Sequence, residues 1–303
     1  MRSSGQTKHD GRGAPVVVAA ELSIVIPCLN AATCLPRQLD ALAAQRWDRR
    51  WEVIVADNGS TDATAAVART YVDRVPNLRV VDASARRGRQ HACNAGARAA
   101  AAAIAFVDAD DEVAPGYVAA IGDALAVHPI VAASIDHVSL NDGWTRESAS
   151  GAQARALQDG FGFLPFGSGG TLGVRADVFD ALDGFADDMH YAEDIDFCWR
   201  AQLAGLPIHF VPGAQLRYRY RPGIRSMYRQ HRNFGRASAL LYRTYRSHGM
   251  PRRDTRTCTR EWLMIGKGAV ALRSRADVAR WSRRVGRCVG RLQGSAHYRV
   301  WYP

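Results

Sequence analysis

Three carboxylates within four residues, at the end of an apolar run, are the group in this sequence best suited to chemistry. The run Ile104–Val107 is followed by Asp108, Asp110 and Asp111. Carboxylates this close raise one another's pKa, so a cluster of them usually has a cation or hydrogen-bond donors to satisfy it. Oxygen ligands placed together suit Mg²⁺ or Mn²⁺, which bind phosphates. The segment indicates a metal–diphosphate site at the end of a strand. The alternative is a solvated acidic turn before a helix that starts at Pro115.

A second pair of carboxylates opens a predicted helix that stops at Gly205. Glu193 and Asp194 stand in its first turn, where the helix dipole favours negative charge, so a purely structural role is one reading. A carboxylate held beside an acceptor hydroxyl can also take its proton as the oxygen attacks, and Asp194 is the candidate for such a general base. Asp196 is expected to stabilise the helix start or to pair with Arg200, four residues further on.

Phosphate binding cannot rest on a glycine motif near the amino terminus. Neither GxGxxG nor GxxxxGK[ST] follows the first predicted strand, so the phosphates of a nucleotide must be held by a metal and by basic side chains. Arg86, Arg87 and Arg89 follow the third predicted strand and could supply that charge. The later segment Gly167–Gly173 is rich in glycine and allows close approach of the backbone to a ligand, although a flexible loop is the alternative.

The elements that must position these groups alternate between strand and helix. Apolar runs without polar alternation are typical of strands buried on both faces. The predicted strands are 22–26, 53–55, 78–81 and 104–107. The predicted helices are one that follows Thr33 as its cap, 61–70 and 89–103. This order favours an open, mostly parallel sheet with helices on both faces.

In such a sheet, ligands bind beyond the carboxyl ends of the strands. Polar residues collect at all four predicted ends: Asn30, then Asp57 with Ser60 and Asp62, then Asp82, then Asp108 and Asp110. A solvated loop explains one such end easily and four in succession less well. The pattern therefore favours a ligand site along this edge.

Composition describes an ordinary soluble chain with an unusual tail. Its 303 residues are 47% hydrophobic and contain no run of about 18 apolar residues such as a membrane-spanning helix needs. Residues 1–20 are expected to be a disordered leader. The six cysteines show no CxxC pair and no zinc spacing, which favours reduced, buried thiols and a cytoplasmic location.

Charge is divided sharply along the chain. From Arg217 onward, 22 Lys and Arg residues stand against three Asp and Glu, a net charge of +19, whereas the preceding residues carry a net charge of −8. Five arginines at helical spacing would line one face of a helix: Arg225, Arg229, Arg232, Arg236 and Arg243. The opposite face would carry Met227, Phe234, Leu241 and Tyr245.

An arginine stripe with almost no acids suits an anionic membrane surface, which would make the protein peripheral on the inner face of the membrane. An ordinary solvated helix face is the alternative. Nucleic acid is disfavoured, because no groove-reading motif or stacking platform accompanies the stripe. Further on, Gly286, Gly290 and Gly294 lie four residues apart and would permit close helix packing. Trp262, Trp281 and Trp301 are expected to be core or interface anchors.

Taken together, these motifs resemble the family 2 glycosyltransferases of GT-A fold, from about Leu22 to Arg221. The matching segments, in order, are SIVIPCLN, VIVADNGSTDAT, RRGRQHACNAG, AFVDADD, GGTLGVRADVF, GF at 184–185 and AEDIDFCWR. Each segment alone is weak, but their order and spacing together are specific. The resemblance implies a GT-A catalytic domain over 21–221, with a nucleotide-binding part at 21–111, an acceptor part at 112–221 and a basic helical region at 222–303.

The family implies transfer of a sugar, with inversion, from a nucleoside diphosphate sugar to an acceptor hydroxyl. A UDP-sugar is the expected donor, and a lipid-linked or cell-envelope glycan the expected acceptor. The residues expected to bind the donor are Pro27, Asn30, Asp57, Ser60, Asp82, Arg87, Asp108 and Asp110. By resemblance, Asp57 would meet the base, Asp108 the ribose or a metal-bound water, and Asp110 a Mn²⁺ or Mg²⁺ ion on the diphosphate. Asp194 would be the catalytic base, with Glu193 shaping its surroundings.

The sequence departs from the family pattern at two places. Family members often have Arg-Asn where this chain has Cys93-Asn94, and many have a downstream metal-binding histidine that is absent from Gln215–Arg221. The arginines of that stretch could meet the diphosphate instead. His190 and His209 lie nearby in sequence, but lone histidines are more often packed or exposed than catalytic.

Two alternatives to a glycosyltransferase are a sugar nucleotidyltransferase and a non-catalytic nucleotide-sugar-binding or scaffolding protein on a degenerate transferase fold. The first would need a glycine-rich, basic loop directly after the first strand, which Ile26–Asn30 does not provide. The second is favoured slightly by the two departures. The presence of Asp108, Asp110 and Asp194 weighs against it.

Overall fold

The fold centres on one mixed sheet. The computed structural model describes residues 20–221 and 223–303, so the predicted leader lies almost wholly outside the described residues. The strands are β1 Leu22–Cys28, β2 Trp51–Asp57, β3 Arg79–Asp82, β4 Ala103–Phe106, β5 Glu112–Val113, β6 Ile130–Asp136, β7 Leu172–Arg175 and β8 Ile208–Arg217. They lie in the order β3-β2-β1-β4-β7-β6-β8-β5. The first four are parallel, β7 runs antiparallel to both its neighbours, and β5 runs antiparallel to β8.

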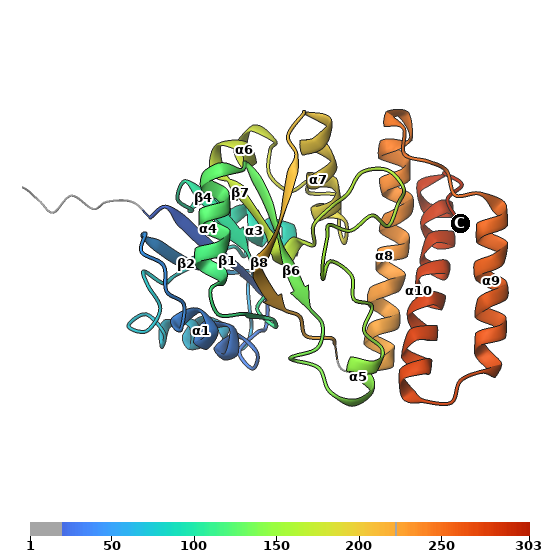
Figure 1. The fold of residues 1–303 in the computed structure, drawn as a ribbon, viewed down its shortest axis with the longest axis horizontal. Coiled ribbons are helices and arrows are strands. Elements are labelled where there is room, and N and C mark those ends of the chain that lie inside the picture. Colours follow the sequence, from blue (N-terminus) through green and yellow to red (C-terminus); the bar gives the residue numbers. More distant parts are fainter. Residues whose placement is uncertain (1–19, 222) are drawn as a thin grey trace, which may run out of the picture.

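Helices cover both faces of this sheet and continue beyond it (Figure 1). Those of the first 221 residues are α1 Leu35–Ala43, α2 Thr64–Arg69, α3 Arg89–Arg98, α4 Tyr117–Val127, α5 Gly143–Glu147, α6 Ala176–Ala181 and α7 Glu193–Leu203. Three longer helices follow: α8 Ile224–Tyr245, α9 Thr255–Val270 and α10 Arg275–Tyr298. The predicted α/β class, the mostly parallel sheet and the helical carboxyl-terminal region are confirmed.

Several predicted details of the elements are wrong. The first helix follows Cys34 and has no side-chain cap, so Thr33 does not cap it. The third helix ends at Arg98 rather than at Ala103, because the chain is already bonding to β1. The amide of Ala101 donates to the Ser23 hydroxyl at 2.8 Å, and that of Ala103 donates to the Glu21 carbonyl.

Two apolar layers, one on each face of the sheet, hold the fold together. Alternate residues of β1 point to opposite layers, with Ile24 and Ile26 on the side of α1 and Val25 on the side of α3. The second layer also receives the end of α8, where Leu241 is fully buried and the Tyr245 hydroxyl donates to Asp196 Oδ1 at 2.6 Å. The core thus continues across residue 221, where the sequence predicts a domain boundary, and that boundary stays a prediction.

The predicted close packing by glycines is confirmed between α8 and α10. A Cβ atom on Gly290 would lie 2.0 Å from the Arg232 carbonyl oxygen, and one on Gly286 would lie 2.7 Å from the Tyr228 carbonyl oxygen. Since real side chains do not approach backbone oxygens so closely, only glycine allows these two helices their observed separation. The predicted apolar face of α8 is also buried at Met227, Leu241 and Tyr245.

Gly290→Ala is expected to lower the free energy of unfolding by about 1–3 kcal/mol, because the added methyl group must push two backbones apart. Chemical denaturation monitored by circular dichroism measures this. Gly266→Ala in α9 is the matched control, since no atom lies within 4 Å of a Cβ there. The control should be neutral or up to about 1 kcal/mol more stable, through helix propensity. Equal effects at the two positions would contradict close packing as the role of Gly290.

Candidate active site

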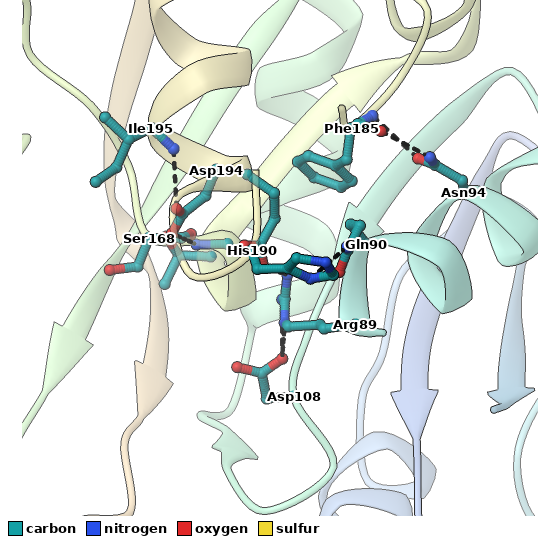
Figure 2. Close-up of polar contacts among 12 residues, drawn as sticks. Arg89, Gln90, Asn94, Asp108, Ser168, Phe185, His190, Asp194 and Ile195 are labelled. Carbon is teal, nitrogen blue, oxygen red and sulfur yellow. Dashed lines mark hydrogen bonds and ion pairs between the residues drawn. The ribbon is translucent and has the colours of Figure 1, made fainter. Parts of the chain in front are cut away.

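One arginine joins the two acidic groups that the sequence singles out. Asp108 follows β4, Glu193 opens α7, and Arg89 opens α3. The Arg89 Nε donates to Asp108 Oδ1 at 2.9 Å, its Nη2 lies 2.8 Å from the same oxygen in an ion pair, and its Nη1 lies 3.4 Å from Glu193 Oε1. Figure 2 shows the Arg89 guanidinium above the Asp108 carboxylate, joined to it by a dashed line. Carboxylates far apart in the sequence therefore share one cation.

Asp194 lies beside this cluster and is held by backbone amides. Its Oδ2 accepts the Gly169 N–H at 2.8 Å, and its Oδ1 accepts the Ile195 N–H at 2.9 Å (Figure 2). Desolvation and, next, the Glu193 carboxylate raise the pKa of Asp194 to about 7, although Arg89 and the two amides act in the opposite direction. A carboxyl with a pKa near 7 is suited to exchanging a proton at neutral pH.

The glycine-rich segment approaches site side chains. A Cβ atom on Gly169 would lie 2.7 Å from Arg89 Nη1, and one on Gly170 would lie 3.0 Å from Asp108 Oδ2. Glycine at these positions therefore makes room for the ion pair, while the Gly169 amide orients Asp194. The loop therefore makes the close backbone approach to site side chains that one of the two readings predicts.

The remaining acids of the first cluster have different surroundings. Asp111 is buried and accepts the Arg219 N–H at 2.8 Å, and its burial raises its pKa well above the usual range. Asp110 is exposed, and among residues 20–221 and 223–303 no other residue forms a hydrogen bond or ion pair with its carboxylate, which faces the more distant charges of Arg221 and Arg219. Two effects raise the pKa of Asp110: first the partial loss of water around its carboxylate, and then the negative charge of Asp108. The Asp110 carboxylate is thus available to a ligand, whereas the Asp111 carboxylate is held by the Arg219 backbone.

The donor set fits a divalent cation that also binds phosphate. Within the described part of the chain, no group of three or more His, Cys, Asp or Glu side chains could hold a metal ion alone. Mg²⁺ is commonly bound by one or two carboxylates together with substrate phosphates and water. Asp110 and the second oxygen of Asp108 supply such carboxylates, so a missing histidine does not disqualify the site.

The ends of β1 and β2 form a polar corner. Asp57 Oδ1 accepts both the amide and the hydroxyl of Ser60, and the Ser60 Oγ accepts the Asn30 N–H at 2.9 Å. Pro27 is half-buried near the end of β1 and pairs in register with Ala56. The structure therefore brings three predicted donor-binding residues into one hydrogen-bonded group.

Asp82 and Arg87 flank this corner. Asp82 pairs in register with Asp57 across β2 and β3, and the Ser84 side chain and, next, the Ser84 N–H that its carboxylate accepts lower its pKa. The guanidinium carbon of Arg87 would lie 3.8 Å from a Cβ on Gly59. Both side chains are exposed, so they are available to a ligand.

Other predicted residues are occupied elsewhere. Arg219 bonds Glu112 and the Asp110 carbonyl oxygen, so it braces the acidic loop. His190 lies 2.8 Å from Gln90 Nε2, and His209 stacks on His128 with ring centres 3.8 Å apart. Each of the two histidine rings therefore has a hydrogen-bonding or stacking partner, and their expected lack of a catalytic role stays a prediction. Asp196 forms the predicted pair with Arg200 at 2.8 Å.

Three amide side chains that the sequence reading did not single out tie the site together. Gln38 donates to the Asp108 carbonyl and accepts the Val113 N–H. Asn58 donates to the carbonyls of Ala83 and Arg86. Asn94 exchanges two hydrogen bonds with the Phe185 backbone, at 2.8 and 3.0 Å (Figure 2). The available signal for Gln38 was a polar residue on the apolar face of α1, and for Asn58 and Asn94 it was their position inside the matched segments VIVADNGSTDAT and RRGRQHACNAG.

Comparison with known proteins identifies the class of this site. Residues 23–183, just over half of the chain, match the family model Glycosyl transferase family 2. The chain therefore belongs to that family of glycosyl-transfer enzymes, as the motif order predicts.

Individual relatives are distant. Glycosyltransferase AglE of Haloferax volcanii is 25% identical over 197 residues, which cover 63% of this chain and 64% of that protein. The chain spans less than two thirds of the length of the first curated relatives it matches.

Solved structures share the fold. A mannosyltransferase from Pyrobaculum calidifontis, in complex with GDP-Man and Mn²⁺, superposes with a TM-score of 0.62 at 18% identity, covering 91% of this chain and 88% of that chain. Glucosyl-3-phosphoglycerate synthase from Mycobacterium tuberculosis, in complex with Mn²⁺, UDP and glucosyl-3-phosphoglycerate, has a TM-score of 0.53 at 20% identity, covering 73% and 79%. At these identities the likeness establishes the GT-A fold.

Arg89→Met is expected to lower the free energy of unfolding by about 1–3 kcal/mol, because it leaves the partly buried carboxylates of Asp108 and Glu193 without their cation. Denaturant unfolding at neutral pH measures the loss. Arg175→Met is the matched control, since it breaks an exposed ion pair with Asp177 worth at most about 1 kcal/mol. A loss no larger than that of the control would show that Arg89 does not stabilise the site.

Proposed function

We propose that this protein transfers a sugar, with inversion, from a UDP-sugar to an acceptor hydroxyl. The observation that carries the proposal is the arrangement around Arg89, which pairs with Asp108 and Glu193 and lies close enough to Asp194, whose pKa is about 7, to lower that pKa. Asp108 and Asp110 suit a metal ion on the departing diphosphate, and Asp194 suits the incoming nucleophile. Membership of the family supports this division.

The donor would lie along the carboxyl ends of β1 to β4. In the proposal, the Asn30–Ser60–Asp57 corner receives the base and ribose, with Pro27 and Asp82 at its border and Arg87 positioned toward the phosphates. Uracil as the base is supported by the UDP in the related-fold synthase, whereas the mannosyltransferase holds GDP-Man. The nucleotide is therefore the first variable to test.

Asp110 and the free oxygen of Asp108 would hold Mn²⁺ or Mg²⁺, which when bound neutralises charge on the departing diphosphate. The Asp110 carboxylate is suited to this role because it has no competing partner in the described residues, whereas Asp108 already shares one oxygen with Arg89. Both solved relatives contain Mn²⁺, which supports the same assignment here.

Asp194 would act as the general base. As the acceptor oxygen forms its bond to the anomeric carbon, the hydroxyl proton passes to Asp194 and the carbon–oxygen bond to the diphosphate breaks. Attack from the face opposite the leaving group inverts the anomeric centre. The negative charge of Glu193 raises the pKa of Asp194, and the hydrogen bond from the Gly169 amide orients the Asp194 carboxylate. A lipid-linked or cell-envelope glycan is the proposed acceptor class.

Asp110→Ala is expected to abolish donor hydrolysis. The wild-type protein with Mn²⁺ should slowly release nucleoside diphosphate from one of UDP-, GDP- or dTDP-sugars without an acceptor, and that donor should raise the Tm. Loss of the free carboxylate should reduce release to background. Asp73→Ala is the control, since Asp73 is exposed on a loop away from the strand ends and should change nothing. No donor binding across the panel would refute the proposed function and favour the scaffolding alternative.

Transfer should also depend on pH through Asp194. The base must be ionised, so kcat/KM is expected to rise through an apparent pKa near 7 and to be about tenfold below its plateau at pH 6. Glu193→Gln removes the charge that raises the pKa of Asp194, and it should shift the acid limb to lower pH. A profile that is flat between pH 5.5 and 8.5, or unmoved by Glu193→Gln, would contradict Asp194 as the base.

A further inference from the structure

The outermost helix, α9, is the least covered helix of the basic region. Figure 1 shows α9 at the end of the molecule remote from the sheet, separated from α8 by α10. Its inward side is defined by Ile265, which is buried, and by Glu261, which pairs with Arg253 and Arg291. The Ile265 carbonyl also accepts the Trp281 indole N–H at 2.9 Å. These contacts fix which side of α9 faces outward.

That outward side carries large apolar side chains. Leu263 is 61% exposed and Val270 is 91% exposed, and they lie seven residues apart on the same helix face. Trp262 and Met264 flank them at 38% and 48%. Trp301 is 55% exposed as well, so of the expected roles as core or interface anchors only the core role is excluded for Trp262 and Trp301, and the interface role stays a prediction. Exposed apolar groups in a row indicate a surface that meets something apolar.

The charges around this face have one sign. Arg256, Arg260 and Lys267 are exposed on the outward side of α9. The acids of the helix and its cap are engaged: Glu261 faces inward, and Asp254 accepts the Thr257 N–H as the helix cap. The face thus combines an apolar centre with an uncompensated positive border.

We infer that α9 docks this protein on an anionic lipid bilayer, with Leu263 and Val270 entering the headgroup boundary. An amphipathic helix with cations beside an apolar face lies in the plane of such an interface. None of the described helices is long and apolar enough to cross a membrane, so the contact is with the surface. The inference goes beyond the proposed sugar transfer and does not depend on it.

Charge argues against the other occupants of this face. A second copy docked face to face would bring Arg256, Arg260 and Lys267 against the same cations. Nucleic acid would satisfy the cations but would gain nothing from Leu263 and Val270. The arginine stripe of α8 offers charge alone, because the apolar face of that helix is buried in the core at Met227, Leu241 and Tyr245. Anionic phospholipid headgroups would pair with the cations of the α9 face, and the acyl chains beneath them would contact Leu263 and Val270.

Flotation of the full chain with vesicles, without donor or metal, tests the inference. We expect binding to vesicles of 70% phosphatidylcholine and 30% phosphatidylglycerol, and little binding to pure phosphatidylcholine. Leu263→Gln with Val270→Gln should lower the partition coefficient about tenfold, since two apolar anchors are lost. The control pair is Val72→Gln with Val127→Gln, which alters exposed valines of the sheet region and should change nothing.

A second set of variants tests the positive side chains of the α9 face separately from its apolar side chains. The triple variant Arg256→Gln, Arg260→Gln and Lys267→Gln should lose about tenfold or more on anionic vesicles, and 0.5 M NaCl should reproduce the loss in the wild type. Its control is Arg69→Gln, Arg98→Gln and Arg155→Gln, three exposed arginines elsewhere. Unchanged Tm and donor hydrolysis in all variants confirm that the fold and the transfer site are intact.

Three outcomes would overturn the inference. One is no binding to anionic vesicles by the wild type. Another is equal binding by the α9 variants and their controls. The last is a dimer in sedimentation that Leu263→Gln with Val270→Gln dissociates while vesicle binding stays the same, since the face would then join two copies. Because donor hydrolysis is measured separately, failure here is distinct from failure of the proposed function.

Discussion

A single guanidinium that faces several carboxylates is the interaction on which the site depends. Asp108 and Glu193 come from different elements, and without Arg89 between them their negative charges would repel at close range. The pKa of Asp194 lies near 7 because desolvation and then the Glu193 carboxylate raise it more than Arg89 lowers it. In the proposed mechanism, this pKa makes Asp194 basic enough to accept a proton near neutral pH.

Much of the surrounding sequence makes room for that guanidinium. Gly169 and Gly170 would each clash with the ion pair if they carried a side chain. Asn94, one turn and a residue beyond Arg89 on α3, fixes that helix to the Phe185 backbone through two hydrogen bonds. The glycine-rich, Asn94 and Gly184–Phe185 motifs are therefore parts of one packing constraint, although they lie in three separate segments of the chain.

The four parallel strands and the polar edge were predictable from the sequence, because uninterrupted β-branched runs and acid-tipped ends are local signals. The strand β5 and the antiparallel direction of β7 were not, since both are defined by partners far away in the chain. The sequence indicated that Arg89 could bind an anion, but not which anion. Its charge suggested phosphate, whereas the structure directs it to carboxylates.

Cys93 explains part of that difference. The family resemblance places an arginine there, but this chain has a buried thiol whose pKa is raised to about 12, so it is neutral. Arg89 lies four residues earlier on the same helix and therefore on the same face. The cluster therefore contains a cation, but it comes from Arg89, about one helical turn before position 93, where the resemblance predicts an arginine. A sequence shows both residues, yet only the fold shows that they share one face and one set of acids.

The basic tail is uniform in composition but not in role, and its inner helix reaches the site. The hydroxyl of Tyr245 in α8 donates to Asp196, which also pairs with Arg200 of the same helix, α7. Asp196 stands in the first turn of α7, two residues after Asp194, so α8 helps to fix the helix start that presents the proposed base. The glycine contacts allow α10 to pack closely against α8, and the Trp281 side chain of α10 donates a hydrogen bond to the Ile265 carbonyl of α9. On its inner side the carboxyl-terminal region thus supports the part of the sheet edge that carries the proposed site. Its outer side, α9, has exposed apolar residues.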